Sequence, residues 1–294
     1  MSIIKSFSVD NGDMFYIKHG SDNFTIIDCN LNDRNQAEIL KELTEESSSK
    51  DISRFISTHP DEDHISGLSD IEEEMGISNF YCVKNNATKN EPSKSFKTYQ
   101  ALRDSSKAFY VYKNCSRRWL NQEDDIRGSS GLSILWPDTN NEDYKKELLK
   151  VSIGESPNNI STIIQYSLKN GVKVLWMGDL ETEFMKKIEE WVEWPEIDIL
   201  FAPHHGRKSG KVPKSILDKL NPKIIVIGEA DTLRLNYYQG YNKITQNSTG
   251  DIVFDCHPGK VHIHVKSDAY STTYLEMENS PRLSGFNYIG TLNL

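Results

Sequence analysis

The sequence predicts an α+β fold of four layers, an αββα sandwich in which two β-sheets face each other and helices cover their outer faces. Two observations support this prediction. Short apolar runs of strand length alternate with segments of helical periodicity along the 294 residues. Tight turn sequences such as Lys169-Asn-Gly171 separate several of the runs. We expect a single domain over residues 1–294, with an inserted segment at about 84–130.

The first part of the chain is predicted to form strands joined by turns and two helices. Helical spacing of apolar residues places helices at 31–45, where Ile39, Leu40 and Leu43 share one side, and at 65–75. The remaining apolar runs have the length of strands and are bounded by turn formers. These strands are expected at residues 3–9, 14–18, 24–28, 52–58 and 80–83.

The second part of the chain repeats the alternation of strand and helix. Helices are predicted at 142–151, 181–192 and 213–220, the last with Pro213 in its first turn, where proline is well tolerated. Strands are predicted at 132–136, 160–168, 172–177, 197–202, 224–227, 251–255, 261–265 and 272–276. Together the two strand-rich parts supply the two sheets.

The segment from Lys84 to about Ser130 looks irregular, basic and aromatic. Its basic residues are Lys84, Lys89, Lys94, Lys97, Arg103, Lys107, Lys113, Arg117 and Arg118, and its aromatic residues include Phe96, Tyr99, Phe109, Tyr110, Tyr112 and Trp119. Cations beside stacking rings favour single-stranded nucleic acid, which we expect as a binding partner. The alternative is that the aromatic residues form a small core of the segment itself, with the lysines as its solvated face.

Composition narrows the function classes. A formal net charge of −9 argues against general polyanion binding. The chain has no apolar run of about 18 to 20 residues and no signal-peptide layout at its start, so we expect no membrane insertion and a cytoplasmic location. Cys29, Cys82, Cys115 and Cys256 lack the spacing of a zinc finger or redox motif and are expected to be reduced packing residues.

A cluster of candidate metal ligands follows the predicted strand at 52–58. The segment His59-Pro-Asp61-Glu-Asp63-His64 holds four imidazole or carboxylate groups within six residues, on a loop between a strand and a helix. Such groups converge readily on zinc, manganese or iron and repel each other without a cation. The alternative is a solvated acidic turn in which an aspartate caps the next helix.

Two later strands end in further candidate ligands. The run from Val174 ends in Gly178-Asp179, and the run from Ile197 ends in Pro203-His204-His205-Gly206. Both would place these side chains at the edge of a sheet. Taken singly, Asp179 could equally be a helix cap, and adjacent histidines could be incidental to the loop.

The order of these motifs resembles the metallo-β-lactamase superfamily, whose fold is an αββα sandwich with metals at the sheet edges. Within it, the pattern is most similar to the hydrolase domain of ComEC-type competence proteins and their stand-alone relatives, which have Asp where Asp61 stands. Asn159-Ile160-Ser161 and Gly250-Asp251-Ile252 match further motifs of that group. The resemblance spans roughly residues 3 to 266.

The resemblance implies a dinuclear site. It implies that His59 and Asp61 bind one metal, that Asp63, His64 and His204 bind the other, and that Asp179 bridges them. The sequence departs from the superfamily because no histidine lies between His64 and His204, so the usual third ligand of the first metal is absent. Asn159 or water would have to replace it. The choice of His204 over His205 is arbitrary at this stage.

We therefore expect a metal-dependent hydrolase with one or two Zn²⁺ or Mn²⁺ ions, in which a metal-bound hydroxide attacks the substrate. Asp61 in place of imidazole favours manganese somewhat. We expect Asp63 and His205 to be catalytic, with His205 protonating the leaving group or, alternatively, making a structural hydrogen bond.

The expected substrate class is a phosphodiester, and specifically a nucleic acid. Arg207, Lys208, Lys211 and Lys214 follow the histidine pair and could steer a phosphate, so Arg207 and Lys208, with Asn159, are candidate substrate contacts. One alternative is a small-molecule hydrolase acting on a cyclic nucleotide, lactone or other ester with the same metals. Another is a degenerate metal-binding module that serves a partner protein.

Overall fold

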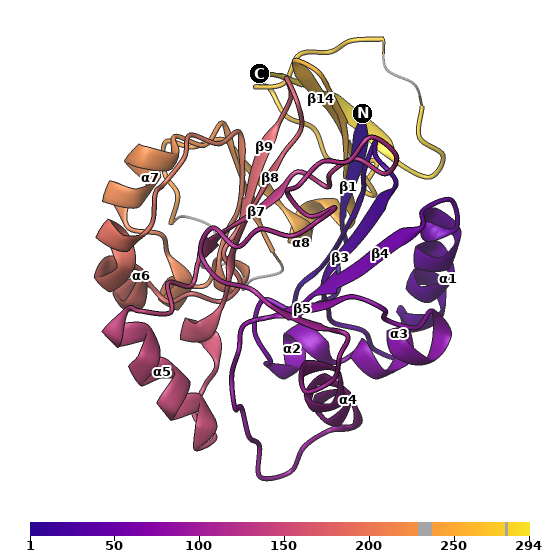
Figure 1. Ribbon diagram of the computed structural model, residues 1–294. Coiled ribbons are helices and arrows are strands. Elements are labelled where there is room, and N and C mark those ends of the chain that lie inside the picture. The colour runs from indigo at the N-terminus through magenta and orange to yellow at the C-terminus, as the bar shows by residue number, and fades with distance from the viewer. Residues whose placement is uncertain (229–236, 280–281) are drawn as a thin grey trace.

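Two β-sheets lie face to face in the computed structural model, which describes residues 1–228, 237–279 and 282–294 (Figure 1). The first sheet has the order β15 (Asn287–Asn293), β14 (Lys260–Val265), β13 (Ile252–His257), β1 (Ser2–Ser6), β2 (Met14–Lys18), β3 (Asn23–Cys29), β4 (Ile52–Ile56), β5 (Phe80–Cys82), β6 (Ala108–Tyr110). The second has the order β12 (Lys243–Thr245), β11 (Ile224–Ile227), β10 (Ile199–Phe201), β9 (Lys173–Trp176), β8 (Ile163–Ser167), β7 (Leu132–Trp136).

Helices cover the outer face of each sheet, which confirms the predicted four-layer α+β fold (Figure 1). On the first sheet lie α1 (Gln36–Ser47), α3 (Leu68–Glu74) and α4 (Lys94–Arg103). On the second lie α5 (Glu142–Ser152), α6 (Thr182–Ile188) and α7 (Lys214–Leu220). The short helices α2 (Glu62–Ile65) and α8 (Gln246–Thr249) lie nearer the junction of the sheets.

Aromatic side chains join the two sheets. The ring of Phe15 on β2 lies 4.8 Å from that of Phe201 on β10 and 6.0 Å from that of Trp176 on β9. Trp176 and Phe201 stack at 5.1 Å, and Phe254 on β13 meets Phe201 edge-on. Each such pair adds about 0.5–1.5 kcal/mol beyond the burial of its surface. The packed rings fix the separation of the sheets near the ends of β9 and β10.

Parallel pairing directs the functional loops to one edge of the molecule. β3 pairs parallel with β4, and β9 pairs parallel with β10. The carboxyl ends of parallel strands lie at the same edge, so the residues after β3 and β4 are neighbours, as are those after β9 and β10. A backbone hydrogen bond from Thr162 N to Thr58 O, 3.1 Å long, ties the edges of the two sheets together.

The inserted segment is more regular than predicted. It contains α4 and β6, and β6 extends the first sheet by pairing parallel with β5. Ser93 caps α4 by accepting a hydrogen bond from Phe96 N, and Phe96, Tyr99 and Leu102 line its buried face. This spacing is helical, so the irregular interpretation was wrong. Phe96 and Tyr99 are buried, as the alternative proposed, but they join the main core, where Tyr99 meets Phe80 of β5, and do not form a separate core of the segment.

Other differences concern element boundaries and the C-terminal part. The predicted helix at 65–75 is divided between α2 and α3 at Gly67, whose backbone leaves the helical region with φ −90° and ψ 2°. Only glycine fits there, because a Cβ would lie 2.4 Å from Leu31 Cγ. The predicted strand at 272–276 is wrong, since it forms only an isolated bridge from Glu276 to Thr291. Thr291, the partner in that bridge, lies on β15. Sequence periodicity predicted neither β15 nor β12.

All four cysteines are buried and free, as expected for packing residues. Within residues 1–228, 237–279 and 282–294, no helix is long and apolar enough to cross a membrane.

A buried histidine at the end of β2 makes stability depend on pH. His19 Nε2 lies 2.9 Å from Thr25 Oγ1, which itself accepts a hydrogen bond from Arg54 Nη1, so the hydroxyl proton is directed to a neutral imidazole. Burial, followed by the charges of Arg54 and Lys50, holds the pKa of His19 well below its usual 6.5. The unfolded chain therefore gains a proton below pH 6.5 that the folded chain does not.

We expect the free energy of unfolding to fall by up to about 1.4 kcal/mol per pH unit below pH 6.5 because of this one group. His19→Gln, which keeps a polar atom near Thr25 but does not titrate, should lack that contribution. Urea unfolding of both proteins at pH 7.5 and 5.5, with a chelator present, measures it. Parallel losses of stability in the two proteins would contradict a neutral His19.

Candidate metal centre

Polar side chains from five segments meet where the two sheets come together. Asp13 precedes β2, Asp28 lies near the end of β3, and the segment from His59 to His64 follows β4. Asp179 follows β9, and the pair His204-His205 follows β10. The first three segments belong to the first sheet and the last two to the second, so the site exists only when both sheets are in place.

Local backbone features bring these segments close. Asp61 caps α2 by accepting a hydrogen bond from Glu62 N, which starts the turn that carries Asp63 and His64. At Gly178 a Cβ would lie 2.8 Å from Ser161 Cβ and 3.0 Å from Thr58 Cβ, so only glycine allows the approach of the strands there. His204 and His205 both have φ near 53°, a left-handed conformation that costs non-glycine residues about 1–3 kcal/mol and is found mainly at functional sites.

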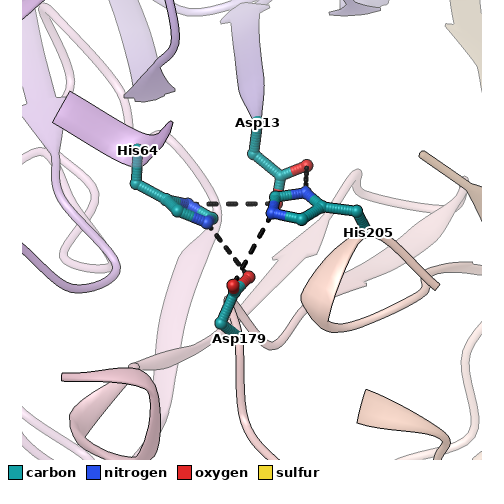
Figure 2. A group of neighbouring side chains, drawn as sticks. All are labelled: Asp13, His64, Asp179 and His205. Atoms are coloured by element: carbon teal, nitrogen blue, oxygen red, sulfur yellow. Dashed lines mark hydrogen bonds and ion pairs between the residues drawn. The ribbon is translucent and has the colours of Figure 1, made fainter. Parts of the chain in front are cut away.

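Asp13, His64, Asp179 and His205 form a group that could hold a metal ion, with one potential ligand atom from each within 4.8 Å of all the others (Figure 2). His64 Nε2 lies 3.0 Å from Asp179 Oδ1, and His205 Nε2 lies 3.6 Å from Asp179 Oδ2. Asp63 is also adjacent, because its Oδ2 lies 3.3 Å from His205 Nε2. Both imidazoles are fully buried.

The two nitrogens of each imidazole face different partners. His64 Nδ1 lies 2.8 Å from Asp28 Oδ2, and His205 Nδ1 lies 3.1 Å from Asp13 Oδ1. A carboxylate accepts a hydrogen bond at Nδ1 and thereby leaves the lone pair on Nε2. Asp28 and Asp13 are therefore placed to orient the rings, and the atoms that converge are the Nε2 atoms with the carboxylates of Asp63 and Asp179. On this geometry Asp13 lies behind the ligands.

Buried nitrogen and oxygen atoms that could bind a metal, and that form no hydrogen bond, lie at the centre of the site. Among the described residues, the side-chain atoms His59 Nε2, His64 Nε2, His205 Nε2 and Asp179 Oδ1 are buried and have no hydrogen-bond partner. His64 and Asp179 are close enough for an ion pair but are not aligned for a hydrogen bond. Unsatisfied buried polar atoms are costly, and a divalent cation would satisfy the lone pairs of His64, Asp179 and His205 at once. The donor set therefore fits a metal ion.

Strong electrostatic coupling accompanies this arrangement. Burial would lower the pKa of His64, but the charges of Asp179 and Asp28 outweigh it and raise that pKa well above its usual value. In the same way Asp13 and Asp179 overcome burial and raise the pKa of His205 to about 10. Burial would raise the pKa of Asp179, yet the charges of His64 and His205 hold it well below the usual range. Without a metal, protons on the two imidazoles balance the carboxylates, and a cation would take over that role.

The remaining residues of the 59–64 segment have distinct environments. His59 Nδ1 lies 3.1 Å from Thr58 Oγ1, which donates to Asp28, so its Nε2 carries the lone pair. Burial and then the charge of His64 lower the pKa of His59 to about 3. Asp61 faces a different direction, because its Oδ1 lies 3.3 Å from Lys89 Nζ, and its side chain is 38% exposed.

Predicted residues on the second sheet lie at the border of the group. His204 Nε2 lies 3.6 Å from Asp179 Oδ2, but it also accepts a hydrogen bond from Arg207 Nη1 at 3.1 Å. Asn159 holds Glu181, since its Oδ1 accepts from Glu181 N and its Nδ2 donates to Glu181 Oε2. Lys208 is exposed and lines a groove with Glu181, Lys211 and Tyr237.

Asp13 is the residue that the sequence did not single out. It follows Asp10-Asn-Gly12, whose turn chemistry explains all of these residues without a functional role. In the structure this turn also contacts the 59–64 segment. Asp13 N donates a hydrogen bond to Asp63 O, and a Cβ on Gly12 would lie 2.5 Å from that same oxygen. An apolar strand that begins directly after an aspartate was the only available signal.

Comparison with known proteins gives structural neighbours only. No family model matches the chain, and no curated protein does. Igni18, a metallo hydrolase from the archaeon Ignicoccus hospitalis, has 15% identity and a TM-score of 0.48, with 86% of this chain and 99% of that chain covered. A Thermotoga maritima protein of the metallo-beta-lactamase superfamily has 16% identity and a TM-score of 0.34, with 80% and 79% covered. A second protein from that organism, described as a metallo-beta-lactamase, has 15% identity and a TM-score of 0.38, with 68% and 95% covered.

The orientation of His64 by Asp28 leads to a testable expectation. In Asp28→Asn the amide would keep the hydrogen bond from Thr58 N but place an NH₂ group or a weaker oxygen against His64 Nδ1, which favours the tautomer that blocks Nε2. We expect metal affinity to fall about 10–100-fold. The fold should persist, because asparagine tolerates the left-handed backbone at this position, where φ is 54°.

Isothermal titration of metal-free protein with Zn²⁺ and Mn²⁺ measures this affinity. Asp255→Asn is the matched control, since Asp255 pairs with His257 outside the group. Equal metal affinity in Asp28→Asn and the wild type would contradict the orienting role of Asp28.

Proposed function

We propose that this protein is a metal-dependent hydrolase whose ion is held by Asp63, His64, Asp179 and His205. One observation carries the proposal. The buried Nε2 atoms of His64 and His205 converge with carboxylate oxygens. The Nδ1 atoms of the same two rings contact Asp28 and Asp13 on the opposite side. The motif order described above supports it. The geometry favours His205 as the ligand over His204, whose Nε2 already accepts a hydrogen bond from Arg207.

A bound divalent ion would lower the pKa of a water molecule and neutralise charge that develops on the substrate. The chain supplies the rest. The packed rings of Phe15, Trp176 and Phe201 lie beneath the site and give it an apolar floor. Arg207 lies at its border, where a guanidinium can pair with two oxygens of a phosphoryl group. His204, whose pKa burial lowers, accepts a hydrogen bond from Arg207 at Nε2 and so helps to hold the guanidinium in place.

For the substrate we propose a phosphodiester. Arg207, Lys208 and Lys211 follow the histidine pair, and within the described part of the chain none of them forms an ion pair with a carboxylate. Lys208 and Lys211 line a groove that also contains Tyr237, and Lys211 Nζ lies 5.8 Å from the centre of the Tyr237 ring. Cations beside a partly exposed ring suit a nucleotide, with the phosphate toward the metal and a base on the tyrosine.

The inserted segment offers less support for nucleic acid than its composition indicated. Lysines and arginines of that segment form ion pairs with carboxylates: Lys89 with Asp61, Lys94 with Glu73, Arg103 with Asp104, Lys107 with Glu72, Lys113 with Glu193, and Arg118 with Asp124. Neutralised cations release few counterions from a polymer. This observation favours the second candidate, a hydrolase of small phosphodiesters or other small esters at the same site.

Metal dependence tests the proposal directly. The wild-type protein should retain divalent metal after dialysis and cleave a phosphodiester with Mn²⁺ or Zn²⁺, and a chelator should abolish cleavage. Asp179→Asn should lower both metal retention and cleavage more than about 100-fold, because it removes a ligand charge. Substrates to compare are single- and double-stranded DNA, RNA, bis(p-nitrophenyl) phosphate and a lactone.

The substrates that react separate the candidates. Cleavage of polymers supports a nuclease, whereas cleavage of the small phosphodiester or the lactone alone supports the second candidate. Metal binding with no hydrolysis of any of them would reject the hydrolase and leave a metal-binding module.

The groove beside Tyr237 allows a second test. Replacing Lys208 and Lys211 together by alanine should raise the KM for single-stranded DNA about tenfold at low salt and flatten its salt dependence, because two phosphate contacts are lost. Lys169→Ala with Lys173→Ala is the control, since these exposed lysines lie at the other end of β9. Equal effects of the two double variants would refute a specific phosphate track.

A further inference from the structure

Lys89 reaches Asp61 and Glu62, at the border of the candidate metal centre, from the loop between β5 and α4. Its Nζ lies 3.3 Å from Asp61 Oδ1 and 3.3 Å from Glu62 Oε2, and its side chain is 26% exposed. The ammonium group also lies 5.0 Å from the centre of the Phe96 ring on α4. Three groups from two elements therefore hold one cation at the start of α2.

The loop places Lys89 firmly. Immediately before it, Thr88 Oγ1 donates to Ser152 O on α5, and Thr88 N donates to Val151 O. Ala87 is buried, with its backbone N bonded to Asn85 Oδ1 and its carbonyl accepting from Gln100 Nε2 on α4. The loop is anchored to helices of both outer layers, so Lys89 differs from a lysine that moves freely on a surface.

The Lys89 ammonium group pairs with Asp61, which the resemblance assigned to the first metal as a ligand. Asp61 Oδ1 is already engaged by Glu62 N at 2.9 Å and by Lys89. His59 Nε2 remains available there, but no histidine between His64 and His204 exists to complete a third ligand. Among the described residues, the one group with the geometry for an ion contains His64, Asp179 and His205, and neither His59 nor Asp61.

We propose that Lys89 supplies the positive charge of the first metal position, so that the protein binds a single divalent ion tightly, at Asp63, His64, Asp179 and His205. This inference rests on the proposed function, since it assumes that the ion binds there. A fixed ammonium beside Asp61 repels a second cation by its charge and withholds a carboxylate that this cation needs.

Metal stoichiometry tests the inference without relying on activity. After dialysis against a trace of Zn²⁺ or Mn²⁺, elemental analysis should find one equivalent per wild-type chain, and titration should find any further site at least 100-fold weaker. Lys89→Met has similar length without charge, and it should strengthen the weak site at least tenfold while the tight site stays unchanged. Lys89→Arg should behave as the wild type does.

Two further variants keep the result interpretable. Lys94→Met is the matched control, because Lys94 pairs with Glu73 on the exposed side of α3 and should leave both sites unchanged. Asp61→Asn in the wild-type background should keep the tight equivalent, whereas adding it to Lys89→Met should weaken the second site again. The Asp61→Asn result remains informative if Lys89→Met fails to fold.

The possible failures are distinguishable. Two tight equivalents in the wild type, or an unchanged second site in Lys89→Met, would overturn the role of Lys89 and leave the hydrolase proposal standing. Loss of the tight equivalent in Asp61→Asn would also overturn it. A wild-type protein that binds no divalent ion would reject both.

Discussion

The orientation of two imidazoles by buried carboxylates is the interaction on which the site depends. Asp28 and Asp13 lie against the Nδ1 atoms of His64 and His205, so both Nε2 lone pairs face Asp63 and Asp179. Without those carboxylates, either ring could carry its proton on Nε2, and that nitrogen could not bind a metal. The cluster would then contain only ion pairs between imidazoles and carboxylates. Burial of both imidazoles, of Asp28 and of Asp179 makes the interactions among them stronger, because water screens them little.

The fold serves this interaction through the edges of its parallel strands. β3 and β4 deliver Asp28 and the 59–64 segment, and β9 and β10 deliver Asp179 and the histidine pair. The stacked rings between the sheets fix the distance between these two sets. Left-handed backbone occurs in both sets, at Asp28 on the first sheet and at His204 and His205 on the second. Packing of the surrounding residues must stabilise these strained backbone conformations.

Much of the fold followed from periodicity, because strands buried on both faces and amphipathic helices leave clear apolar patterns. α4 was missed since its aromatic residues were taken for an exposed stacking surface, although Phe96 and Tyr99 are fully buried. β12 was missed because a strand of three residues gains its identity from its partner, β11. β15 has seven residues, but Gly290 and an irregular register with β14 interrupt its apolar pattern. Of the site, the spacing of ligand residues and their positions after strands pointed to His64 and Asp179. The geometric distinction between His204 and His205, and the place of Asp13, depend on backbone angles and contacts that no spacing records.

The candidate ligands come from both sheets, and this has a consequence for how long the protein survives in a cell. An ion bound between His64 and His205 would fasten one half of the sandwich to the other, and binding to the folded state alone adds RT ln(1 + [L]/Kd) to its free energy of unfolding. A shortage of that ion would therefore destabilise the interface between the two sheets and make the chain more susceptible to proteases. The supply of the metal would then govern how much of this protein persists, as well as how fast it works.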